Sequence, residues 1–125
     1  MAVIFFVASQ NKTLANKFIS RHPYVVSGVL ELLSNEIVMS SYRKLSIANI
    51  ASDVVSAWMG DQGVVDELTS RDVENLCAAI KIQQAMPPEA LKNLRILVNA
   101  AKIVQKIPRN KQIISSMLGN KLPSL

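Results

Sequence analysis

The chain has 125 residues, half of them apolar and 18% charged, and it carries a formal net charge of +5. This length predicts one domain, and the apolar content is too high for a disordered protein. Cys77 is the single cysteine, so an intrachain disulfide and a thiolate metal cluster are excluded, and a reducing, cytoplasmic location is expected.

The N-terminal third predicts short helices. Residues 2–8 (AVIFFVA) form the longest apolar run, far below the roughly 20 residues that span a bilayer, so no membrane contact is expected. We expect a helix there, with a short strand as the alternative. Apolar residues spaced by three and four predict further helices over 13–20 and from Pro23 to about Ser34, and a short piece follows near 36–42.

The middle of the chain carries signals for where helices begin and end. Ser46 is placed to cap a helix over 47–59 that buries its apolar face, and Gly60 is placed to end it. The sequence TSRD at 69–72 resembles a capping box with Asp in place of Glu. It predicts a helix from this point to about Ala85.

Prolines divide the C-terminal part. Pro87-Pro88 stops the preceding helix, and Pro88 can open the longest helix of the chain, over 88–107. Pro108 breaks that helix. A last short helix is predicted over about 109–118, with Gly119 at its end.

These elements predict an all-α fold, a compact bundle of five to seven helices with at most one short strand near the N-terminus. No internal repeat or linker divides the chain. We therefore expect a single helical domain over 1–120 and a loose tail over 121–125.

Charge is segregated along the sequence. Residues 53–74 contain six acidic residues and one basic residue, whereas no Asp or Glu follows Glu89. On a helical projection of 88–107, the basic residues fall within less than a third of the circumference, opposite a broad apolar half. The candidate site consists of these basic residues, one nearby Asn, and two cations beyond the proline: Lys92, Arg95, Asn99, Lys102, Lys106, Arg109 and Lys111.

This basic face predicts an anionic partner. Our leading interpretation is contact with nucleic-acid phosphates, because a line of cations can follow a phosphate backbone. The alternatives are an ordinary solvated face, pairing with residues 53–74 of the same or another copy, and docking on an acidic or apolar surface of a partner protein. Trp58 is the last aromatic residue, so base stacking near the basic helix is excluded and weak sequence specificity is expected.

A helix-turn-helix formed by 71–85 and 88–107 is a more specific variant of the nucleic-acid hypothesis. In this variant Lys92, Asn93 and Arg95 would face outward together with Asn99. Any two consecutive helices resemble the motif, so its docking geometry must decide.

Residues with catalytic potential do not form a recognisable set. His22 is the only histidine, the four glycines are isolated, and no acidic pair matches a metal-binding loop. We expect a non-enzymatic protein with no cofactor, no metal and no catalytic residues.

The low charge content and the opposed charged regions predict a homo-oligomer at micromolar concentration. The segment 1–40 is the expected interface, because only four charges lie between Met1 and Ser34 and interface centres are depleted in charge. Sedimentation velocity should detect species heavier than the 13.7 kDa chain. A single monomeric species throughout a concentration series would contradict the prediction.

Overall fold

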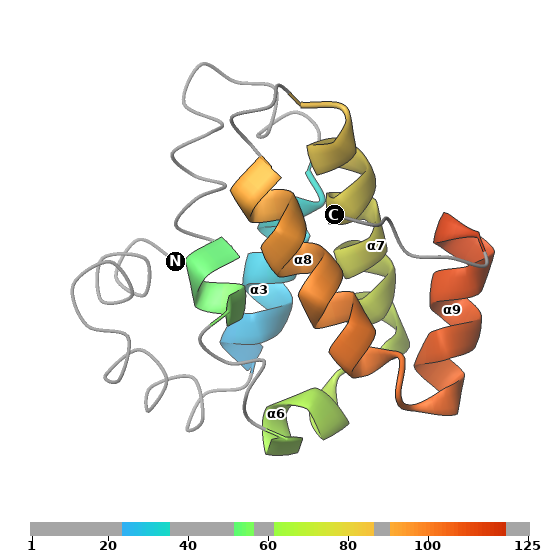
Figure 1. The fold of residues 1–125 in the computed structure, drawn as a ribbon. Coiled ribbons are helices and arrows are strands. Elements are labelled where there is room, and N and C mark those ends of the chain that lie inside the picture. The colour runs from blue at the N-terminus through green and yellow to red at the C-terminus, as the bar shows by residue number, and fades with distance from the viewer. Residues whose placement is uncertain (1–23, 36–51, 57–61, 87–90, 120–125) are drawn as a thin grey trace.

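The fold is all-α, as expected from the sequence. The computed structural model, drawn in Figure 1, describes residues 24–35, 52–56, 62–86 and 91–119. These residues form six helical segments and no strand. The segments are α3 (Tyr24–Leu33), a short helix over 52–56, α6 (Gln62–Glu67), α7 (Ser70–Gln84), α8 (Leu91–Val104) and α9 (Pro108–Leu118).

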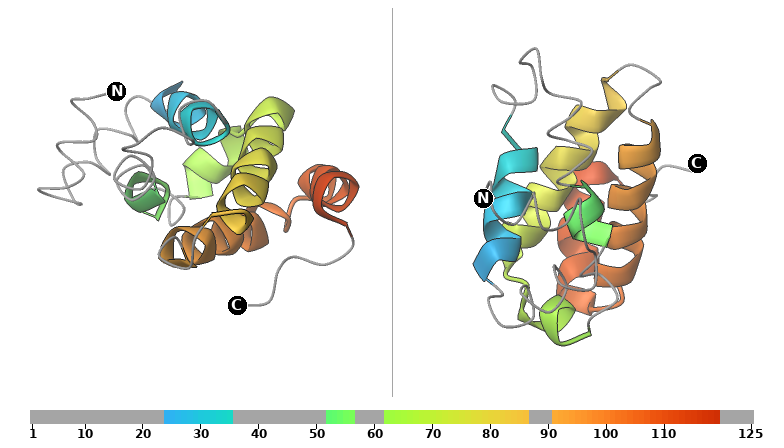
Figure 2. Two further views of the ribbon diagram at one scale, coloured as in Figure 1. Left: turned by 90° about the horizontal axis from the view of Figure 1, so that it is seen from above. Right: turned by 90° about the vertical axis from the view of Figure 1, so that its left-hand side faces the viewer.

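Helix α7 is the centre of the described bundle. It packs against α3, α8 and α9, whereas α8 and α9 touch each other less extensively. The two views of Figure 2 place α7 between α3 and the α8–α9 pair. Figure 1 shows α8 running antiparallel to α7, and α9 turning back to run in the same direction as α7. Both C-terminal helices are therefore held by one supporting helix.

The buried residues form one apolar cluster. Helix α7 contributes Leu76, Cys77 and Ile80, each at most 1% exposed, and Leu97 of α8 is fully buried. Burying a Leu or Ile side chain is worth about 1.5–3 kcal/mol, so these contacts dominate over the weak intrinsic stability of single helices of this length. The extent of the predicted domain, 1–120, and the tail at 121–125 stay predictions because they include residues outside the described ranges.

The start of α7 has the predicted capping box. The Thr69 hydroxyl accepts a hydrogen bond from the Asp72 backbone N–H at 3.2 Å, and the Asp72 carboxylate accepts one from the Thr69 N–H at 3.0 Å. Asp replaces the usual Glu without loss of either bond. The carboxylate also lies in the first turn, where the helix dipole favours negative charge.

The turn between α8 and α9 corrects one predicted boundary. The sequence predicted a helix to Ile107, but α8 ends at Val104. Ile107 has an extended backbone, with φ −84° and ψ 121°, because a residue before proline is driven out of the α region. Pro108 is then the first residue of α9, and the Asn110 amide donates to the Val104 carbonyl oxygen at 3.1 Å. The side chain thus satisfies a carbonyl at the end of α8.

Other predicted elements have mixed outcomes. Helix α3 confirms the helix predicted from Pro23 to about Ser34, and Gly119 ends α9 as predicted, with φ 83°. Within the predicted helix 47–59, residues 52–56 are helical and the others lie outside the described residues. Also outside the described residues lie the elements predicted over 2–8, 13–20 and 36–42, and residues 87–90. Helix α6 was not predicted.

Replacement of Thr69 by Ala should lower the free energy of unfolding by about 1 kcal/mol, because the Asp72 N–H at the start of α7 loses its side-chain acceptor. Ser70→Ala is the matched control, since this neighbouring side chain is exposed and makes no capping bond. Urea denaturation of both variants measures the difference. Equal midpoints would show that the capping box adds no stability.

Candidate functional site

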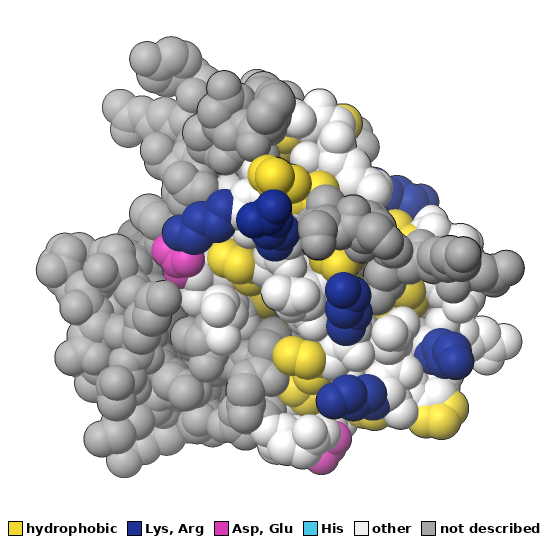
Figure 3. All heavy atoms as spheres, in the orientation of Figure 1, with side chains coloured by type: hydrophobic (Ala, Val, Ile, Leu, Met, Phe, Trp, Pro, Cys, Tyr) yellow, Lys and Arg dark blue, Asp and Glu magenta, His cyan; other side chains and the backbone are white. Residues whose placement is uncertain are grey.

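All seven candidate residues are exposed. Four of them repeat at intervals of three and four along α8, and a fifth follows in the turn after Val104. In Figure 3 the Lys and Arg side chains are spread over the surface of α8 and α9, with acidic side chains only at the margin of the described part. We call this surface the basic face, formed by Lys92, Arg95, Asn99, Lys102, Lys106, Arg109 and Lys111.

One acidic residue reaches the basic face in the described part of the chain. The Lys92 ammonium lies 3.8 Å from the Asp53 carboxylate, and the two side chains are 70% and 30% exposed. A pair this long and this exposed is worth at most about 1 kcal/mol. Lys92 therefore keeps most of its charge available to solvent.

The remaining cations have no carboxylate partner within the described residues. No acidic oxygen there lies within 4 Å of Arg95, Lys102, Lys106 or Lys111. Of the acidic stretch 53–74, only Asp53 makes an ion pair there, while Asp66 accepts a hydrogen bond from the Gln62 amide at 2.8 Å. In this part of the molecule, internal pairing does not account for the charge segregation. Asp61 lies outside the described residues.

Arg109 has a structural contact in addition to its charge. Its guanidinium donates a hydrogen bond of 3.1 Å to the Leu68 carbonyl oxygen, in the connection between α6 and α7. This bond ties the first turn of α9 to the start of α7. A guanidinium has five N–H donors, so Arg109 can still contact an anion.

A small hollow lies in the middle of the basic face. It has a volume of about 110 Å³, and its described lining consists of Arg95, Val98, Asn99 and Lys102. Val98 is 2% exposed and the other three are exposed, so an apolar side chain forms the floor beneath three polar ones. Val98 was not among the candidate residues predicted from the sequence. On a helical projection Val98 lies beside the basic residues, which was the only sequence feature that pointed to it. Its burial in the structure shows that it lies beneath the hollow.

Asn93 corrects the helix-turn-helix variant. The predicted recognition surface required its side chain to face outward, but Asn93 is fully buried. Position 93 falls on the side of α8 that packs inward, together with Leu94 and Leu97. Of the two asparagines predicted to face outward, only Asn99 is exposed.

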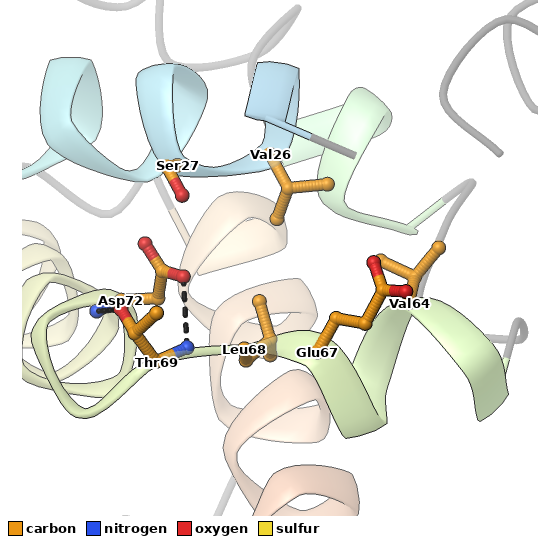
Figure 4. A pocket seen from close by; sticks show the side chains of 7 residues that line it. All are labelled: Val26, Ser27, Val64, Glu67, Leu68, Thr69 and Asp72. Atoms are coloured by element: carbon orange, nitrogen blue, oxygen red, sulfur yellow. Dashed lines mark hydrogen bonds between the residues drawn. The ribbon is translucent and has the colours of Figure 1, made fainter. Parts of the chain in front are cut away.

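A second cavity, of about 190 Å³, has the opposite chemistry. Figure 4 shows it between α3 and the corner formed by α6 and α7, where Ser27 and Val26 face Thr69 and Asp72. Glu67 contributes a second carboxylate to the lining. Two acidic side chains make this cavity unsuitable for a phosphate. One Asp72 oxygen is already engaged in the capping box.

Neither a reactive thiol nor a metal-binding cluster occurs within the described residues. Cys77 is fully buried in the core, and burial raises the pKa of its thiol to about 11; the charge of Glu74 adds to this rise, and that of Lys81 opposes it. No group of three or more His, Cys, Asp and Glu side chains suited to a metal occurs in the described ranges. His22 lies outside them. None of the described helices combines the length and apolarity required to span a membrane.

Comparisons of the chain with protein-family models, curated proteins and solved structures find no match.

Cys77 should react very slowly with an aromatic disulfide reagent at pH 8. With a pKa of about 11, only about one thiol in a thousand is ionised at that pH, and the side chain is also inaccessible to the reagent. Absorbance of the released thiolate measures the rate. The same protein in guanidinium chloride is the control and should react rapidly, whereas equal rates in the two conditions would contradict the burial of Cys77.

Proposed function

We propose that this protein is a small, non-enzymatic binding protein whose basic face contacts the phosphates of nucleic acids. The observation that carries the proposal is the charge of residues 91–119, which include six Lys and Arg residues and no Asp or Glu. An ordinary exposed surface mixes both signs. An exposed surface of one sign attracts an oppositely charged partner and raises the rate of association.

The geometry of α8 suits a phosphate backbone. Lys92 and Lys102 are ten residues apart, which corresponds to about 15 Å along the helix axis. One strand of a duplex advances about 3.4 Å per phosphate, so these cations extend over four to five phosphate steps. Each neutralised phosphate releases condensed counterions, and this release supplies most of the binding free energy of a sequence-independent protein.

Weak sequence specificity follows from what the basic face contains. Asn99 is its only amide side chain, and no aromatic residue occurs after Trp58. Arg and Lys can read guanine when they enter a groove, but contacts along a strand backbone position the protein without reading its sequence. We therefore assign the protein an accessory or regulatory role in which any duplex of suitable charge is bound.

A partner protein with an acidic surface is the second candidate. The Lys92–Asp53 pair favours it, because it shows that a carboxylate of this chain approaches the basic face to 3.8 Å. Leu91, at 39% exposure, is the only large hydrophobic residue exposed in the described ranges, so docking on an apolar surface has little support there.

Neutralisation of Arg95 and Lys102 to Gln should weaken binding to a short mixed-sequence duplex by a similar factor for unrelated sequences. The slope of log K against log salt should become shallower by about 1.8, since two phosphate contacts are lost at about 0.9 each. Fluorescence anisotropy between about 50 and 200 mM salt measures both quantities. The quadruple variant, which also carries Lys92→Gln and Lys106→Gln, should show a larger reduction of the slope.

The matched control is Arg71→Gln with Lys81→Gln. It also removes one Arg and one Lys, both exposed, but from α7. If both double variants weaken duplex binding equally, net charge rather than the basic face is responsible. If the parent protein binds no duplex but loses an acidic protein partner on neutralisation of Arg95 and Lys102, the second candidate is correct.

A further inference from the structure

We infer that one backbone phosphate binds in the hollow lined by Arg95, Val98, Asn99 and Lys102. This phosphate site would fix where a nucleic acid lies on the basic face. This inference rests on the proposed function and adds a specific anchoring site to it. A uniform line of cations would let a duplex slide along α8, whereas a hollow bordered by two cations and an amide holds one phosphate in place.

The two cations lie on the same side of α8, one on each side of the turn that carries Val98 and Asn99. Arg95 and Lys102 are seven residues apart, so they lie about 20° apart around the helix and about 10.5 Å apart along it. Asn99 and Val98 occupy the turn between them. Side chains on a helix lean toward its N-terminus, which brings the Lys102 side chain toward this turn, whereas Arg95 borders the hollow from its N-terminal side.

The three polar side chains supply complementary interactions with a phosphate. The Arg95 guanidinium offers a planar fork suited to two phosphate oxygens, and the Lys102 ammonium acts as a compact positive charge. The Asn99 amide contributes two N–H donors and no charge. No carboxylate of the described residues lies within salt-bridge distance of Arg95 or Lys102, so neither cation must first give up an acidic partner there.

The size of the hollow fits a chemical group rather than a whole ligand. A volume of about 110 Å³ corresponds to three or four water molecules, at about 30 Å³ each in the liquid. Pockets for drug-sized ligands have about 300–1,000 Å³. The buried Val98 side chain closes the bottom of the hollow, so that an anion in it would lie beside the two cations and the amide at its border.

The test compares two variants that each add one negative charge to the basic surface. Asn99→Asp places the charge in the hollow and removes the two amide donors, while Gln112→Glu places it beside Lys111 on α9, outside the hollow. Both side chains are exposed, so both variants should keep the melting temperature of the parent. Asn99→Ala is a further variant that removes the amide donors without adding charge.

With the same duplex and anisotropy assay, Asn99→Asp should weaken binding by about tenfold to a hundredfold, because hydrogen bonds to an ionised group are lost. Gln112→Glu should weaken it by less than about fivefold, as expected for one exposed charge. Asn99→Ala should fall between them. If Asn99→Asp and Gln112→Glu have equal effects while neutralisation of Arg95 and Lys102 still reduces the salt slope, the anchoring site is wrong and the proposed function stands.

Inorganic phosphate provides a probe that is independent of nucleic acid. Titration at constant ionic strength, with chloride as the reference anion, should shift the NMR resonances of the Asn99 side-chain amide more than those of Gln112. Absence of a selective shift would contradict the phosphate-binding site. If the shift is selective but the protein binds no duplex, the phosphate-binding site is supported and the proposed function is wrong.

Discussion

The packing of α7 against three other helices is the interaction on which the rest of the described structure depends. Helices of 10–15 residues are marginal by themselves in water, and their stability comes from a buried apolar face. Helix α7 provides that face for α3, α8 and α9 together. The capping box of Thr69 and Asp72 fixes the residue at which this supporting helix begins.

The same packing determines which side of α8 becomes basic surface. Because Leu94, Leu97 and Val104 are buried, rotation of α8 about its axis would expose apolar area at about 25 cal/mol per Å². The cations at the opposite positions are consequently held outward. This arrangement allows residues 91–119 to accumulate positive charge, since solvent screens the repulsion between exposed cations.

The connection from α8 to α9 extends the basic face beyond one helix. Pro108 forces the preceding residue out of the helix, and Asn110 and Arg109 then bond to the Val104 and Leu68 carbonyl oxygens. These two bonds orient the first turn of α9, which carries Lys111, relative to both α7 and α8. An Arg at 109 is thus explained by structure as well as by charge, so its substitution is a less selective test of anion binding than that of Arg95 or Lys102.

Local sequence patterns were enough to predict the helical class, the start of α7 at its capping box, the end of α9 at Gly119, and the exposure of the candidate residues. These features depend on local chemistry: side-chain caps, proline geometry, glycine at positive φ and apolar spacing. Packing between distant parts of the chain accounts for the burial of Asn93, the hydrogen bond from Arg109 to Leu68, and the position of Val98 beneath a hollow. Each of these depends on which distant residues pack against the helix, and helical periodicity places a residue at an angle around the axis without specifying what covers it.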